Sequence, residues 1–201
     1  MRAGDEGRFM LPIGYLMIEH RLIDRMIDMM KDEMDRIGQY GRVDTVFIEA
    51  AVYFTHSYTD VCHHGKEEAI YFKALDSKPL SAEHRKIMND LIQEHVFVRK
   101  TVDDIEHAKD SYVRGEKDSM ANVISALNII TIFYPQHLEK EEKHFFYPSM
   151  EYFTKEEKDR MLVDFAEFDG KLFHAEHQKI IEDLEKKRGV SRSGSSTEAK
   201  A

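Results

Sequence analysis

The sequence predicts an all-α fold, an up-down-up-down four-helix bundle with an additional C-terminal helical segment. Apolar residues recur every three or four positions through four long segments, which is the period of an amphipathic helix. The period-two alternation of a half-buried strand is nowhere sustained. Short loops join the long segments, and such loops favour antiparallel neighbours.

The first two predicted helices are bounded by recognisable start and stop residues. The first begins at Pro12, which suits an opening turn, and ends near Ile37, because Gly38 follows. The second has Asp44 as its expected N-cap and continues to about Leu75. A Ser-Lys-Pro turn then separates it from the next segment.

The third and fourth helices complete the predicted bundle. Ser81 is the expected N-cap of the third helix, which should continue to about Arg114. The fourth helix should end near Met150 and contains Pro135 in its interior. Because proline lacks a backbone N–H, we expect a kink there.

One domain is expected, at residues 1–190, because 201 residues with 42% hydrophobic content suit a single core. Its bundle core should span about 12–150. A helical extension at about 154–188 opens with a capping box and is interrupted near Gly170. The Ser- and Gly-rich tail, 191–201, is expected to be disordered.

Charge and composition exclude several classes of function. The net charge of -9 disfavours nucleic acid and anionic membranes as partners, because both require a basic surface. We find neither a secretory signal nor an apolar run long enough to span a bilayer, so a cytoplasmic protein is expected. The single cysteine, Cys62, fits a reducing compartment and is expected to be a buried structural thiol.

A His-x-x-x-Glu unit occurs twice, in the second and fourth predicted helices. One copy is His63 with Glu67, and the other is His137 with Glu141. On a helix, residues four apart lie on the same face, so each imidazole should stack above a carboxylate. Two such units on facing helices are a typical arrangement for enclosing a dinuclear metal site.

The first and third helices each place one histidine, His20 and His95, in an otherwise apolar stripe. By helical rise, both lie near the level of the two His-x-x-x-Glu units. Buried polar groups need partners, so four imidazoles and two carboxylates in one layer predict a shared metal site. This donor set suits iron or manganese better than structural zinc.

Two ambiguities remain in the second and fourth helices. The apolar stripe of the second helix lies closer to His64 and Glu68, whereas the match to the fourth helix favours His63 and Glu67. His144 lies one turn after the second glutamate and is a candidate further ligand. The neighbouring charged residues are expected to face solvent, namely Lys66, Glu68, Lys140 and Glu142.

These motifs resemble the hemerythrin-like, or HHE cation-binding, family over about residues 12–150. The resemblance implies a non-haem di-iron centre with two bridging glutamates, where manganese or zinc are possible substitutes. The ligands implied are His20, His63, Glu67, His95, His137 and Glu141. The oxygen carriers have a further histidine four residues after the third-helix ligand, where this chain has Arg99, so an open position or a substitute ligand is implied.

Two functions fit this resemblance. The leading hypothesis is a binding protein that captures dioxygen or nitric oxide, or that handles or senses iron. The alternative is a redox enzyme, namely an oxidase, a peroxidase or a nitric oxide reductase of the iron-sulfur repair type. No glycine-rich nucleotide-binding pattern is present, so an enzyme would need an external electron-donor protein.

Overall fold

The structure is a computed structural model that describes residues 11–170 and 173–190. Within these residues every regular element is helical, which confirms the all-α prediction. Four long helical runs follow one another along the chain. They are α1 (Pro12–Tyr40); α2 (Thr45–Phe54) continued by the π-helices η1 (Thr55–His64) and η2 (Glu67–Phe72) and by α3 (Lys73–Asp76); α4 (Ala82–Val113); and α5 (Ser119–Glu139) continued by the π-helix η3 (Lys140–Phe146) and by α6 (Tyr147–Met150).

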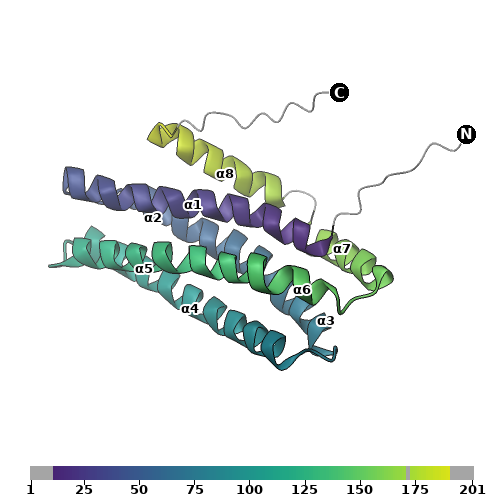
Figure 1. Cartoon of the computed structure of the whole chain (residues 1–201). Helices are drawn as coiled ribbons and strands as arrows, with labels where there is room; N and C mark the ends of the chain where they lie inside the picture. Colours follow the sequence, from purple (N-terminus) through teal and green to yellow (C-terminus); the bar gives the residue numbers. More distant parts are fainter. Residues whose placement is uncertain (1–10, 171–172, 191–201) are drawn as a thin grey trace, which may run out of the picture.

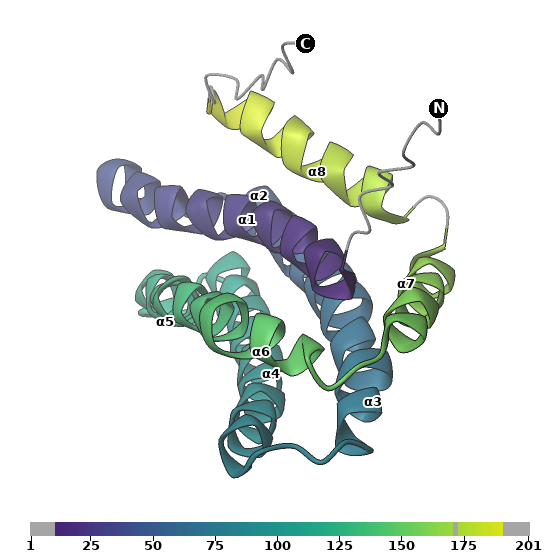
Figure 2. The same ribbon diagram turned by 45° about the vertical axis from the view of Figure 1, so that its right-hand side comes forward.

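The four runs lie side by side, and a further pair of helices covers one flank (Figure 1). Helix α5 packs against both α1 and α4, and α2 packs against α4. The flanking pair is α7 (Lys155–Asp169) and α8 (Phe173–Arg188). In the turned view, α8 lies over α1 and α2, whereas α7 lies near α3 (Figure 2). The C-terminal extension therefore covers the side of the bundle formed by the first two runs.

The predicted helix starts are confirmed by their capping bonds. The side chain of Asp44 accepts a hydrogen bond from the backbone of Phe47 at 3.0 Å, and Ser81 caps α4 in the same way. Thr154 opens α7 with both bonds of the capping box. The first helix ends three residues beyond the predicted Ile37, because α1 continues through Gly38 to Tyr40. It ends where Gly41 adopts a left-handed φ of 65°, which glycine tolerates without strain.

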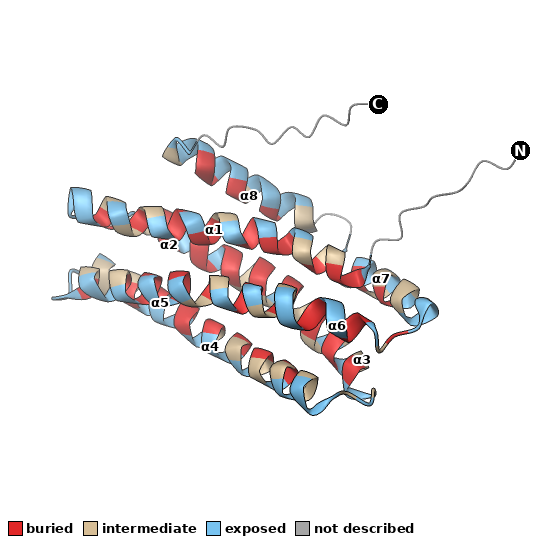
Figure 3. Ribbon diagram, viewed as in Figure 1, coloured by how far each residue is buried: buried red, intermediate tan, exposed pale blue. Residues whose placement is uncertain are grey.

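Two apolar clusters fill the interior, one toward each end of the bundle (Figure 3). One contains Met26, Phe47 and Leu127, and the other contains Leu16 and Phe145. In the first three runs, the predicted ligand residues fall between the stretch that joins the first cluster and the stretch that joins the second, and in the fourth run they lie at the boundary, where Leu138 of the first cluster follows His137. The fold therefore contains a buried polar layer between two apolar clusters.

Neither end of the chain is described, so the tail predicted at 191–201 lies outside the described residues. Among the described helices, none combines the length and apolar character that crossing a bilayer requires.

Candidate metal centre

Four imidazoles and two carboxylates meet in the polar layer. Each of the six side chains is at most 1% exposed, so they are shielded from water. All four helical runs contribute to the group. It comprises His20 on α1, His63 in η1, Glu67 in η2, His95 on α4, His137 on α5 and Glu141 in η3. The structure thus brings together all six residues that the sequence predicted as ligands.

The Nε2 atoms and the carboxylate oxygens face one another across a small space. The Nε2 atoms of His20 and His63 are 3.1 Å apart. Glu67 Oε2 lies 3.7 Å from Nε2 of His63 and 3.4 Å from Nε2 of His95. Glu141 lies within 3.3 Å of His20 and 3.2 Å of His137. Each carboxylate therefore contacts one imidazole from the first two helical runs, which carry His20 and His63, and one from the last two, which carry His95 and His137. These two sets are called the two halves of the centre below.

The same donor atoms lack hydrogen-bond partners within the described residues. Both oxygens of Glu67, both oxygens of Glu141 and the Nε2 atoms of His95 and His137 are buried and unsatisfied. Burying polar atoms in this way is unfavourable, and it is rare in native proteins. Metal cations would satisfy all of these atoms together, so the donor set fits the group that the sequence predicted.

One comparison with known proteins decides the family. The family model described as "Hemerythrin HHE cation binding domain" matches residues 11–147. This chain belongs to the hemerythrin HHE cation-binding family. Neither the search of curated proteins nor the search of solved structures gave a match. The HHE match includes all six residues of the polar layer, whereas α7 and α8 lie beyond it.

A carboxylate holds the outer nitrogen, Nδ1, of each of the four imidazoles in the HHE centre. The four bonds are Glu19 to His63 at 2.9 Å, Glu68 to His95 at 2.8 Å, Glu94 to His137 at 2.9 Å and Glu142 to His20 at 2.8 Å. A carboxylate accepts here, so Nδ1 carries the proton and Nε2 is left as the free base that a metal requires.

The two halves of the centre repeat this pattern. Glu19 and Glu94 each precede a lone histidine, and each binds the histidine of the His-x-x-x-Glu unit in its own half. Lys66 and Lys140 donate to the second oxygens of these glutamates. Glu68 and Glu142 instead bind across the halves, to His95 and His20. The doubled sequence motif therefore produces an approximate two-fold repeat in the hydrogen bonds.

Burial and close charges have opposite effects on the pKa values of the two glutamates, Glu67 and Glu141. Burial raises the pKa of Glu67 well above its usual value, and the neighbouring charge of Glu141 raises it further. Burial also acts to raise the pKa of Glu141, but the charge of His137 and the close approach of His20 and His95 lower it well below the usual value. Without a cation, one glutamate therefore tends to keep a proton while the other is ionised.

Of the four charged residues expected to face solvent, Lys66 contradicts the prediction, and the other three are only partly exposed because they bind groups of the centre. Lys66 is fully buried, and the side chains of Glu68 and Glu142 are only about one third exposed, at 32% and 35%. The reason is the second hydrogen-bonding position of imidazole, which the apolar pattern does not reveal. A glutamate directly beside four of the six predicted ligands, His20, Glu67, His95 and Glu141, was the available signal. Lys140, at 33% exposure, binds Glu94 rather than water alone.

The structure bears on two questions that the sequence left open, namely whether His144 is a ligand and whether His63 or His64 faces the centre. His144 is exposed, so it does not reach the layer. His63 and Glu67 face the other ligands, but His64 is also fully buried beside them. Both histidines lie in η1, where the wider π-turn changes the angle between successive side chains. A straight α-helix would direct only one of the two inward.

A second group of potential metal donors is already neutralised by a lysine. Glu19, Cys62 and Asp169 lie close together beside the HHE centre. The ammonium group of Lys66 donates to all three, with Asp169 at 2.5 Å and the thiol sulfur at 3.3 Å. The ammonium group of Lys66 therefore occupies the position between these donors that a metal ion would need. Cys62 is buried, as predicted, and burial raises the pKa of its thiol.

Proposed function

We propose that this HHE protein is a non-haem di-iron protein that binds a small diatomic ligand, dioxygen or nitric oxide, or holds iron for sensing or delivery. The observation that carries the proposal is the set of buried, unpartnered donor atoms on Glu67, Glu141, His95 and His137. Two cations are inferred because each glutamate faces imidazoles of both halves. The proposal takes the four runs as an up-down-up-down bundle, because short loops join them.

The chemistry of the donors supports iron over other metals. Imidazole and carboxylate suit iron or manganese, whereas structural zinc sites usually have thiolates or four ligands. The only cysteine binds Lys66 and Asp169 instead. When bound, iron would supply reversible coordination of a gas and one-electron chemistry. Manganese or zinc remain possible substitutes in the same site.

The walls of the centre support a small neutral ligand. Phe146 stacks on the ring of His20 at 5.6 Å, and Phe72 stacks on His95 at 6.0 Å. These rings give the centre apolar walls that shield it from water. A neutral diatomic molecule needs neither a charged partner nor a large cavity. We also expect a cytoplasmic location, since a single cysteine fits a reducing compartment.

A second candidate function is a redox enzyme that uses an external electron-donor protein. The hydroxyl of Tyr134 favours it, because this group is buried in the core and its ring lies 5.4 Å from that of His137. Reduction of dioxygen or nitric oxide consumes protons, and a buried hydroxyl can deliver one.

Metal analysis and gas-binding spectra test the proposal. Protein purified from iron-replete cells should contain about two iron ions per chain, as dinuclear bundle sites do. After anaerobic reduction, mixing with dioxygen or nitric oxide should give a visible spectrum that reverses when the gas is removed. Repeated gas consumption with an added donor would support the enzyme instead. Retention of zinc alone would overturn the proposal, and an iron-loaded protein that reacts with neither gas would overturn gas binding and leave iron sensing or delivery.

Variants of the bridging residues provide the control. Glu67→Ala and Glu141→Ala should each reduce the iron content below that of the wild-type protein. Glu139→Ala on the same helical run should not, because Glu139 is exposed and pairs only with Lys143.

A further inference from the structure

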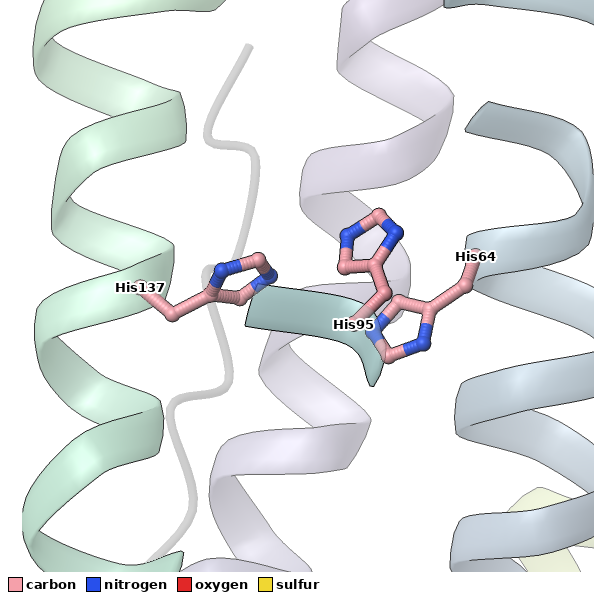
Figure 4. Close-up of side chains that lie close together, drawn as sticks. All are labelled: His64, His95 and His137. Atoms are coloured by element: carbon pink, nitrogen blue, oxygen red, sulfur yellow. The ribbon is translucent and has the colours of Figure 1, made fainter. Parts of the chain in front are cut away.

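A fifth histidine lies inside the centre, beyond the six predicted ligands. One ring nitrogen of each of His64, His95 and His137 lies within 4.8 Å of the others. The three rings approach one another from three different helical runs (Figure 4). His64 is fully buried. Its ring stacks on that of His95, with centroids 3.9 Å apart and planes inclined by 11°, so the two imidazoles lie face to face.

Like the four predicted ligands, His64 has a carboxylate beside its Nδ1. This carboxylate belongs to Asp60, one helical turn earlier, and lies 3.4 Å from Nδ1, while Nε2 lies 3.1 Å from the hydroxyl of Tyr134. The carboxylate of Asp60 is in turn bound by Arg99 at 2.7 Å. A carboxylate on Nδ1 prepares Nε2 to bind a metal.

Arg99 occupies the position where the oxygen carriers of this family have a further histidine. Its guanidinium binds Asp60 and also Glu68, at 2.8 Å, and Glu68 holds Nδ1 of His95. Arg99 therefore connects the carboxylates behind His64 and His95. It stabilises the stacked pair of imidazoles and is not itself available as a ligand.

The two-fold repeat provides an internal comparison. The counterpart of His64, directly after the histidine of the other unit, is Leu138, which is 5% exposed and belongs to an apolar cluster. In the other half of the centre, a leucine therefore fills this position and packs in the apolar core. A histidine that is buried here, and aimed at two other imidazoles, has a chemical role that the other half of the centre lacks.

We propose that His64 is a third imidazole ligand for the metal held by His95 and His137, whereas His20 and His63 hold the second metal. The proposal rests on the dinuclear centre proposed above. It makes the two metals inequivalent, with three imidazoles on one and two on the other.

Anaerobic titration of the metal-free protein with Fe²⁺, together with Mössbauer spectra of the iron-57 form, tests this assignment. The variant His64→Leu copies the counterpart residue and should fold. Wild-type protein should bind two ions and give two distinct quadrupole doublets. In His64→Leu, one binding step should weaken by at least about 10-fold, the other should persist, and one doublet should shift.

A second variant separates ligation from hydrogen bonding, because the hydroxyl of Tyr134 lies 3.1 Å from Nε2 of His64. Tyr134→Phe should keep both binding steps and both doublets. If His64→Leu binds two ions with the wild-type spectrum, His64 is only a partner of Tyr134 and the assignment is wrong. Wild-type protein that binds no iron would instead overturn the proposed function, so the two failures are distinguishable.

Discussion

Two lysines with the same hydrogen-bond role differ in burial. Lys66 and Lys140 each bind the glutamate that holds a histidine of the centre. Lys66 is fully buried and also binds Asp169, whereas Lys140 is 33% exposed. Because the glutamate partners of the two lysines are equivalent, a difference in stability between variants of Lys66 and Lys140 should result from the burial of Lys66 and its additional bond to Asp169.

Replacing each lysine by methionine therefore gives a matched test of stability. Lys66→Met leaves two buried carboxylates without a cation and should reduce the free energy of unfolding by about 3–5 kcal/mol. Lys140→Met removes a partly solvated pair and should reduce it by about 1 kcal/mol or less. Urea denaturation, with both variants in the same metal state, measures the difference. Equal losses of unfolding free energy in the two variants would show that the burial of Lys66 does not increase its contribution to stability.

At the scale of the helices, apolar periodicity and capping residues predicted most of the fold. Asp44, Ser81 and Thr154 start the helices that the sequence assigned to them. The π-helices were not predicted, because hydrophobic patterns do not distinguish an i+5 turn from an i+4 turn. The repeat therefore favoured His63 and the apolar stripe favoured His64, but the burial of both histidines depends on π-helix geometry and was not predicted.

The start of α8 provides a pH-dependent contact with the bundle. His174 binds the hydroxyl of Tyr58 at 2.6 Å. Burial lowers the pKa of His174 below its usual value, the charges of Lys66 and His177 lower it further, and Asp169 opposes them. Because the folded state disfavours the charged ring, this contact contributes stability above about pH 6.5 and loses it as the pH falls.

We therefore expect acid to loosen α8 through this histidine. Hydrogen exchange in residues 173–188 should accelerate between about pH 7 and pH 5, after correction for intrinsic rates. In His174→Gln the acceleration should be smaller, whereas the exposed residue His107 should give a wild-type response when changed to Gln. Identical pH profiles for wild type and His174→Gln would contradict this role.

At the scale of the whole molecule, the C-terminal extension is joined to the metal centre by a chain of hydrogen bonds. The chain runs from Asp169 at the end of α7 through Lys66 and Glu19 to Nδ1 of His63. The extension is also anchored elsewhere, by the paired bonds of Arg25 to Glu185. Sequence reasoning predicted these helices but not this contact, because the partners of a buried lysine depend on tertiary packing.

Removing the charge of Asp169 should therefore affect metal retention. Asp169→Asn weakens the bond to Lys66, so Glu19 should hold His63 less firmly and iron should transfer to a chelator several-fold faster. Glu19→Gln, which changes the histidine's own partner, should have the larger effect, about 10- to 100-fold in metal affinity. Glu167→Gln, an exposed change on α7, should release iron at the wild-type rate. If Asp169→Asn matches Glu167→Gln, the extension packs against the centre without influencing it.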